Sequence, residues 1–230
     1  MGDMDWDDAT RESLEVALNE SEVVGVRLAP DSSYVDVLLH VNALPESGPL
    51  VKDSRRILRL TSPSELCFLL CDQVGGQLAP AAALPLADLA AVEDFFGSLA
   101  WSGSVYGWRF FDDPELAGDW PADLSLRVAV RTESSAHTFY WFNECGAERN
   151  GETGSYCIEG TVTFDDLFVL DADTREIPID TFIAEGCRYW AALFARDKRL
   201  SDDAQRVAQQ DPPRWRAWAT GSSCAASEVA

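Results

Sequence analysis

The stretch from Leu124 to Phe194 limits the fold more tightly than any other part of the chain. Residues 124–131 alternate apolar and polar side chains, which is the period-2 pattern of a half-buried strand. Residues 138–144, 161–170 and 176–179 predict three more strands, and the first of these is too aromatic for either face to be mainly solvent-exposed. Strands that follow one another in this way predict a system of hairpins.

A helix is expected directly after these strands. Asp180 or Thr181 can cap it, because short polar side chains accept hydrogen bonds from first-turn amides. Its apolar residues recur at helical spacing and form one stripe that needs a packing partner. These residues are Ile183, Cys187, Trp190 and Phe194.

The rest of the chain adds short strands and one more substantial helix, which is amphipathic over residues 86–96. The strands are predicted at 22–29, 33–43, 56–60, 65–72 and 105–111. About nine strands and two substantial helices predict an α+β fold, mainly an antiparallel β-sheet or sandwich with the helices packed on it. Strands without helices between them argue against a parallel doubly wound sheet.

The length of 230 residues suits a single globular domain. We expect it over residues 1–219, with an internal connector at 74–85 and a disordered tail at 220–230. Residues 161–173 (Thr-Val-Thr-Phe-Asp-Asp-Leu-Phe-Val-Leu-Asp-Ala-Asp) resemble a late strand of jelly-roll sandwiches, carbohydrate-binding modules among them. The resemblance favours the sandwich form of the fold and names no family.

Net charge limits the classes of partner. A formal charge of −21 and a pI near 4.2 repel nucleic acid and anionic membrane surfaces. No apolar run approaches the roughly 20 residues of a membrane span. The acidic start, Met-Gly-Asp-Met-Asp, lacks the basic and apolar regions of a secretory signal. We therefore expect a cytoplasmic protein with no membrane and no nucleic-acid partner.

The charge is also unevenly distributed. Residues 144–185 contain eleven acidic and two basic side chains, whereas residues 188–216 contain seven basic and four acidic ones. An acidic region of this kind can complement the basic region of the same chain, or it can steer a cationic partner. A general acidic bias of the source proteome is the alternative explanation.

Catalytic and cofactor motifs are missing from the sequence. His40 and His137 accompany no Gly-x-Ser-x-Gly elbow, and neither a Walker loop nor Gly-x-Gly-x-x-Gly occurs. Cysteine and histidine spacings form no zinc site, and Asp-x-Asp-x-Arg at 171–175 has an arginine where a calcium loop needs its third ligand. We expect no metal, no cofactor and a binding protein more than an enzyme. A hydrolase that uses carboxylates such as Asp165 and Asp166 is the third hypothesis.

The six cysteines are expected to be free thiols, because no secretory signal accompanies them. Cys145 and Cys157 are the exception to consider, since they flank a Gly-rich loop at 146–154 and could pair across a hairpin in an oxidising compartment. The sequence leaves their state open.

Two aromatic groups have binding potential. The first could form a platform for a sugar or another small ligand, because Trp and Tyr rings stack on sugars and cations. Its residues are Trp108, Tyr140, Trp141 and Tyr156. The second is Arg-Trp-Arg-Ala-Trp at 214–218, which suits a docking peptide or a contact with single-stranded nucleic acid. Given the net charge of −21, the favoured interpretation is that it folds back onto the acidic sheet of its own chain.

The leading functional hypothesis is an acidic, cytosolic, non-enzymatic binding or inhibitory protein, similar in behaviour to toxin-neutralising immunity proteins. Its basic protein partner would bind the region 144–185. The expected contact residues are Glu144, Glu148, Glu152, Glu159, Asp171 and Asp173. The alternative is a protein that binds a small ligand or carbohydrate on an aromatic-lined sheet surface.

Overall fold

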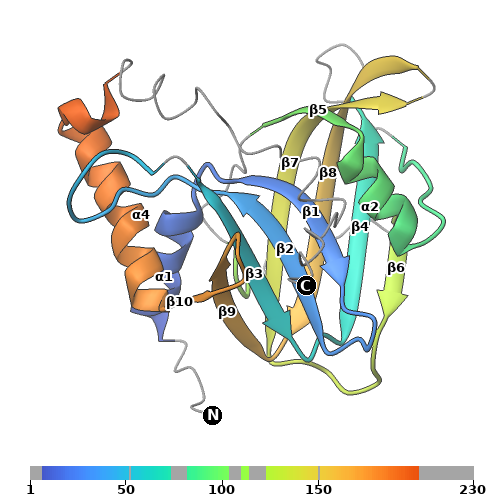
Figure 1. Ribbon diagram of the computed structural model, residues 1–230. Coiled ribbons are helices and arrows are strands. Elements are labelled where there is room, and N and C mark those ends of the chain that lie inside the picture. The colour runs from blue at the N-terminus through green and yellow to red at the C-terminus, as the bar shows by residue number, and fades with distance from the viewer. Residues whose placement is uncertain are drawn as a thin grey trace, which may run out of the picture.

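The computed structural model describes residues 7–51, 53–73, 82–103, 110–113, 123–149 and 151–201 (Figure 1). These residues form an α+β fold with ten strands in two antiparallel sheets and three α-helices, which confirms the predicted fold class. Among them, no helix has both the length and the apolar character needed to cross a membrane. Most of the predicted strand at 105–111, most of the connector and the whole tail at 220–230 lie outside the described residues. The single-domain assignment stays a prediction.

The first sheet has the strand order β1-β2-β3-β9-β10, and each neighbouring pair is antiparallel. Its strands are β1 (Glu22–Leu28), β2 (Tyr34–His40), β3 (Arg55–Thr61), β9 (Asp166–Asp171) and β10 (Glu176–Ile177). The second sheet has the order β5-β7-β8-β4-β6 and is also antiparallel throughout. Its strands are β5 (Leu99–Ser102), β7 (His137–Arg149), β8 (Glu152–Phe164), β4 (Glu65–Asp72) and β6 (Leu126–Ala129).

The two sheets lie as two layers (Figure 1), and side chains from both belong to one buried hydrophobic cluster. Alternate residues of β2, such as Val35 and Val37, and alternate residues of β7, such as Phe139 and Trp141, belong to the same buried cluster. Successive side chains of a strand point to opposite faces, so the remaining residues of each strand form the outward faces of the two layers. A binding surface on either sheet must therefore be built from these outward residues.

One continuous stretch of chain passes from the second sheet into the first. β8 ends at Phe164 and β9 begins at Asp166, so Asp165 lies at the crossing. Its backbone N–H donates to the carbonyl of Thr61 at 3.0 Å, and its carboxylate accepts from the Arg131 guanidinium at 2.6 Å. The crossing separates acidic residues of β8 from those of β9, although they are close in sequence.

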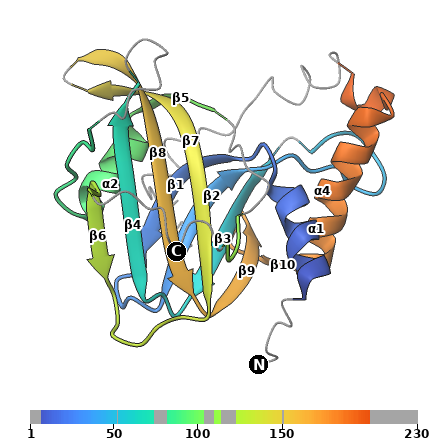
Figure 2. The same ribbon diagram turned by 180° about the vertical axis from the view of Figure 1, so that it is seen from behind.

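The helices pack around the sheets. α1 (Asp8–Leu18) and α4 (Ile179–Phe194) lie side by side at one end, and α2 (Leu89–Gly97) packs against β1 (Figures 1 and 2). The N-cap of α1 is Asp7, whose carboxylate accepts from the Thr10 amide at 2.7 Å.

The predicted start and apolar stripe of α4 differ from those in the structure. The helix begins after Pro178, and no side chain caps it. Its buried residues are Phe182, Gly186 and Ala192, whereas Phe194 of the predicted stripe is 82% exposed. Gly186 explains the difference, because a missing side chain lets α1 approach the backbone of α4, and apolar periodicity does not register a glycine.

The contact between Gly186 and α1 predicts an unusual result for Gly186→Ala. A Cβ at this position would lie 2.5 Å from Ala17 Cα and 2.6 Å from Ala17 Cβ, so the helices must separate. Alanine stabilises an exposed helix position by about 1 kcal/mol relative to glycine. We expect the opposite sign here, a loss of about 1–3 kcal/mol in the free energy of unfolding, because overpacking a core is destabilising. Urea denaturation measures it.

The matched control is Thr181→Ala, an exposed position in the first turn of the same helix. This change raises helix propensity without adding an atom to the helix interface. The free energy of unfolding of the Thr181→Ala variant should equal that of wild type or be slightly higher. A Gly186→Ala variant that is as stable as this control would contradict the close packing of α1 on α4.

Candidate functional site

The six acidic residues expected to bind a partner occupy three separate places. Glu144 of β7 and Glu159 of β8 lie on the outward face of the second sheet. Glu148 and Glu152 lie near the β7–β8 turn, where Arg149 pairs with Glu152. Asp171 and Asp173 belong to the turn between β9 and β10 in the first sheet. The structure therefore brings together the first pair but not all six.

Strand register places Glu144 and Glu159 close to each other. Glu144 lies opposite Cys157, and Phe142 lies opposite Glu159, so the two glutamates are diagonal neighbours across the β7–β8 ladder. Diagonal neighbours of this kind are about 7–8 Å apart. Cys71 of β4 lies opposite Cys157 on the other side, which extends the same surface across a third strand.

We call this surface the acidic face. It comprises the outward side chains of β7, β8, β4 and β6, together with the Trp101 side chain of β5. Figure 2 shows β7, β8 and β4 on the side of the molecule that faces the viewer. Its residues are Glu65, Cys67, Leu69, Cys71, Trp101, Arg127, Tyr140, Phe142, Glu144, Cys157 and Glu159.

The two central glutamates of the acidic face have neutral hydrogen-bond partners. Glu144 accepts from the Gln73 amide at 2.9 Å, and Glu159 accepts from the Tyr140 hydroxyl at 2.8 Å. Across the described part of the chain, neither carboxylate forms an ion pair. The single guanidinium on the face, that of Arg127, is 3.3 Å from the third carboxylate, Glu65. Within the described ranges, therefore, no cationic side chain pairs with Glu144 or Glu159.

Two thiols on the acidic face respond to this negative charge. Burial raises the pKa of the Cys157 thiol, and the nearby charge of Glu144 raises it further. Burial likewise raises the pKa of Cys71, with added contributions from Glu159 and Asp72. The pKa of Tyr140 is also raised, first by burial and then by Glu159. In all three groups burial is the largest cause of the raised pKa, and the neighbouring carboxylates act in the same direction.

Aromatic side chains border the two glutamates. Trp101 is 46% exposed and lies over Gly146, where a Cβ would overlap its indole. Phe142 and Tyr140 are partly exposed on the same face. Sequence reasoning missed Trp101, because its position depends on an irregular β5–β7 pairing that leaves no periodic signal.

Of the four residues expected to form a ligand platform, the three that the structure describes do not share a surface. Trp141 is fully buried, stacks on Phe139 and meets Phe68 edge to face, so it belongs to the core. Tyr156 is 8% exposed and also points into the core, whereas Tyr140 points outward. Trp108 lies outside the described residues.

The cysteines considered for a disulfide point to opposite faces of the second sheet. Cys145 is buried in the core and lies opposite Tyr156, while Cys157 points outward. The described residues form no disulfide. The reason is that β7 and β8 continue almost to the turn, as the pairing of Arg149 with Glu152 shows, so the segment 146–154 is a tight hairpin rather than a long loop.

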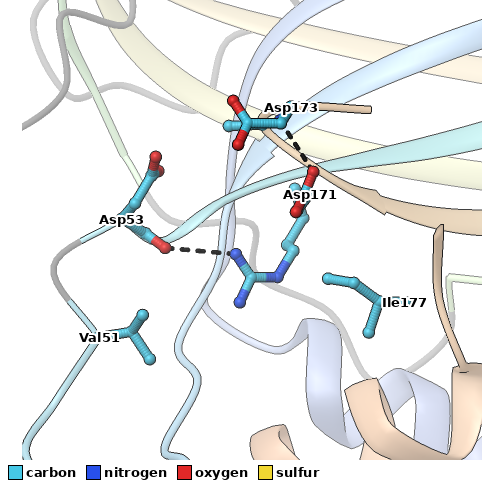
Figure 3. A pocket seen from close by; sticks show the side chains of 7 residues that line it. Val51, Asp53, Asp171, Asp173 and Ile177 are labelled. Atoms are coloured by element: carbon cyan, nitrogen blue, oxygen red, sulfur yellow. Dashed lines mark hydrogen bonds between the residues drawn. The ribbon is translucent and has the colours of Figure 1, made fainter. Parts of the chain in front are cut away.

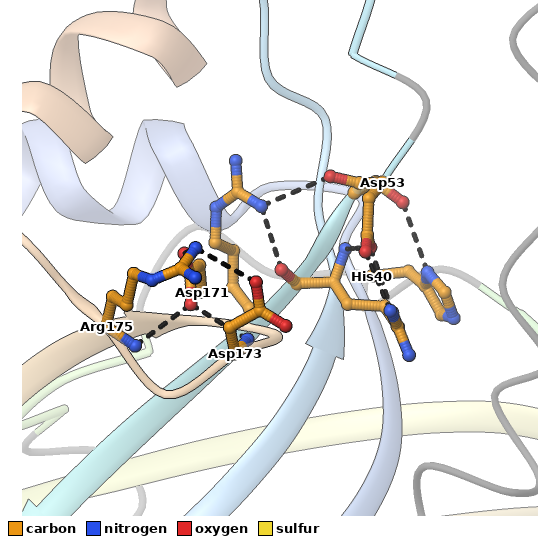
Figure 4. A network of polar contacts seen from close by, with 8 residues as sticks. His40, Asp53, Asp171, Asp173 and Arg175 are labelled. Atoms are coloured by element: carbon orange, nitrogen blue, oxygen red, sulfur yellow. Dashed lines mark hydrogen bonds and ion pairs between the residues drawn. The ribbon is translucent and has the colours of Figure 1, made fainter. Parts of the chain in front are cut away.

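Asp171 and Asp173 belong to an ion-pair network at one end of the first sheet (Figure 4). Arg175 lies 2.9 Å from Asp173 and 3.9 Å from Asp171, and the Asp171 carboxylate also accepts the backbone N–H groups of residues 173 and 175. Nearby, Asp53 accepts two hydrogen bonds from the Arg55 guanidinium at 2.9 and 2.7 Å. These carboxylates are occupied, so a partner would have to displace an arginine to use them.

A pocket of about 310 Å³ adjoins this network (Figure 3). Its lining combines carboxylates with apolar side chains and the buried Arg56, and comprises Val51, Asp53, Arg56, Asp171, Ala172, Asp173 and Ile177. Arg56 donates to the backbone carbonyls of residues 53 and 55 and lies 3.7 Å from Glu185.

Other catalytic candidates are also engaged in structural contacts. His137 Nδ1 lies 2.8 Å from Asp112, and His40 Nδ1 lies 3.1 Å from the Ser54 hydroxyl. Asp165 is paired with Arg131. Within the described ranges, no group of three or more His, Cys, Asp or Glu side chains is placed to hold a metal ion.

No family model matches the chain, and comparison with curated proteins and with solved structures gave no match either. A function for this chain therefore has to follow from its own residues. The acidic face is the described surface that combines uncompensated charge, partly exposed aromatic rings and adjacent positions on a rigid sheet.

The proximity of Glu144 to Cys157 predicts an effect on thiol titration. Glu144→Gln removes a negative charge that raises the pKa of Cys157, so this pKa should fall and more thiolate should be present at about pH 8. Alkylation of Cys157 by iodoacetamide, quantified on its peptide by mass spectrometry, should become faster. Its pH profile should move to lower pH. Glu176→Gln, on the other sheet, is the control and should leave the profile in place.

Proposed function

We propose that this chain is a non-enzymatic binding protein whose acidic face holds a positively charged segment of a basic protein partner. The observation that carries the proposal is the pair Glu144 and Glu159, two neighbouring carboxylates that form no ion pair in the described part of the chain. In this interpretation the acidic region 144–185 acts mainly through these two residues. An inhibitory, immunity-like role in the cytoplasm is the form of binding that best suits such a surface.

The chemistry of the face favours arginine and lysine. Arginine pairs with carboxylates through two parallel hydrogen bonds, and its planar guanidinium stacks on aromatic rings. Trp101 and Phe142 place such rings beside Glu144 and Glu159. A cationic side chain on this face would gain both contacts, and the net charge of −21 would accelerate its approach.

The other expected contact residues are less suited to hold a cation, because they are either already paired with an arginine or lie at the edge of the face. Asp171 and Asp173 would have to give up Arg175 before they could bind a partner. Glu148 and Glu152, near the β7–β8 turn, add negative potential close to the face. They would mainly affect the rate of association, because rim charges steer encounter more than they hold the complex.

A second candidate function is small-ligand or carbohydrate binding on the same face. It is favoured by the 46% exposure of Trp101, since an exposed indole suits sugar stacking. The two candidates differ in how salt affects binding. Stacking of a sugar on an indole is insensitive to ionic strength, whereas high ionic strength releases a cationic partner.

The proposal is tested by capture from native lysate with three tagged proteins: wild type, Glu144→Gln with Glu159→Gln, and Asp171→Asn with Asp173→Asn. Wild type and the Asp variant should retain one basic protein that elutes at moderate salt, and the Glu variant should not retain it. Two charge contacts of about 0.5–1 kcal/mol each correspond to a loss of about fivefold to thirtyfold in affinity. Calorimetry on the identified partner measures this loss.

Equal retention by all three proteins, or retention that salt does not affect, would contradict the proposal. If no protein is captured by any of the three and a sugar changes the Trp fluorescence of wild type, carbohydrate binding would be favoured.

A further inference from the structure

Strand pairing places two cysteines directly opposite each other on the acidic face. Cys71 of β4 and Cys157 of β8 are partners in the β4–β8 ladder, although they are far apart in the sequence. Both residues are partly exposed. Cys145, which the sequence suggested as a partner for Cys157, lies in the core on the other side of the sheet. The structure therefore gives Cys157 a different thiol neighbour, on its own face.

The spacing of these two residues suits a disulfide. Gln73 donates its backbone N–H to the Ser155 carbonyl at 2.9 Å, two positions further along the same register. Paired positions in an antiparallel ladder alternate in type, so Cys71 and Cys157 also form a hydrogen-bonded pair, with Cα atoms about 5.5 Å apart. The commonest Cα separation in disulfides is about 5.5–6 Å.

The side chains are slightly further apart than a relaxed disulfide requires. Directly opposite residues have Cβ atoms about 4.5–5.5 Å apart, and hydrogen-bonded pairs are at the long end of this range, whereas disulfides have about 3.5–4.5 Å. Closing the bond therefore draws the Cβ atoms together by about 1 Å. Both strands are internal, since β8 lies between β7 and β4, and β4 lies between β8 and β6. The sheet resists this approach, and a strained disulfide is more easily reduced.

The other described cysteines have no thiol opposite them. Cys67 is four residues before Cys71 on β4, roughly 13 Å along the strand, and lies opposite Thr161 of β8. Cys145 lies opposite Tyr156, and Cys187 belongs to α4. Cys224, like the segment 214–218, lies outside the described residues. Within the described part of the chain, Cys71 and Cys157 are thus the one pair of thiols that strand register brings together.

We propose that Cys71 and Cys157 are a redox modification site, at which a peroxide converts the two thiols into a reversible disulfide. The Cys157 thiolate attacks one oxygen of hydrogen peroxide, the O–O bond breaks, and a sulfenic acid and one water form. The Cys71 sulfur then attacks the Cys157 sulfur, so that the S–S bond forms, the S–O bond breaks and a second water leaves. Two thiols together lose two electrons and two protons, and one peroxide becomes two waters.

The surroundings of the two thiols set the rate of this reaction. The reactive form is the thiolate. Burial is the largest cause of the raised pKa of both thiols, and Glu144 of β7, Glu159 of β8 and Asp72 of β4 add to it. A hydrogen bond from the Gln73 side chain lowers the pKa of Cys157 in part, which favours this thiol as the first to react. Oxidation should therefore be slow at neutral pH and accelerate by up to about tenfold per pH unit above it.

Peptide mapping of the full chain tests the proposal. The reduced protein is treated with hydrogen peroxide at about pH 8, the remaining thiols are blocked, and the monomer is digested without reductant for mass spectrometry. The expected product is a peptide pair linked through Cys71 and Cys157, and dithiothreitol should restore both thiols. Failure to find this link in the oxidised monomer, or its confinement to covalent dimers, would overturn the proposal.

A trapping experiment shows whether Cys71 resolves the sulfenic acid of Cys157. With Cys71→Ser the sulfenic acid loses its neighbouring thiol, so labelling of Cys157 by dimedone should rise at least about fivefold. Cys67→Ser is the matched control on the same strand and face, and its labelling should equal that of wild type. Equal labelling in all three proteins would overturn the proposal. Because the experiment involves no partner protein, its outcome is independent of the proposed function.

Discussion

The pairing of β7 with β8 is the interaction on which the rest of the structure depends. Thirteen residue pairs in an unbroken register give each strand one face in the core and one face outside. Inward residues such as Trp141 and Ile158 join the hydrophobic core, and a Cβ on Gly160 would overlap the Trp141 ring. A slip of one residue would turn Glu144 and Glu159 into the core, so the core itself fixes the acidic face.

Carboxylates in different parts of the structure differ in whether an arginine pairs with them. Most described arginines that form ion pairs do so with carboxylates other than Glu144 and Glu159. Examples are the pairs Arg59–Asp36, Arg55–Asp53, Arg131–Asp165, Arg175–Asp173 and Arg199–Asp197. On the outward face of the second sheet, the described cation is Arg127, which lies beside Glu65. Partly exposed carboxylates such as Glu144 and Glu159 attract a cation over roughly one Debye length, about 8 Å at physiological salt.

The sequence predicted most of the strands, the antiparallel fold class and the acidity of residues 144–185, because alternation and composition are local properties. It was wrong to make residues 161–170 one strand, since they contain the end of β8 and most of β9, and it did not predict β5. It did not show which acidic residues share a surface, since the crossing at Asp165 sends β8 and β9 into different sheets. One signal was available and not used. The dipeptide Asn150-Gly151 is typical of a two-residue hairpin turn, and Gly151 has the positive φ of 82° that such a turn requires. Placing the turn there would have paired residue 144 with 157 and separated Cys145 from Cys157.

The most direct test of the acidic face as a cation-binding surface is the binding of a short arginine-rich peptide, measured by calorimetry at low and at physiological salt. The account predicts that wild type and Asp171→Asn with Asp173→Asn bind the peptide with an affinity that falls as salt rises, and that Glu144→Gln with Glu159→Gln binds it at least about fivefold more weakly. Equal affinities in all three proteins would contradict it.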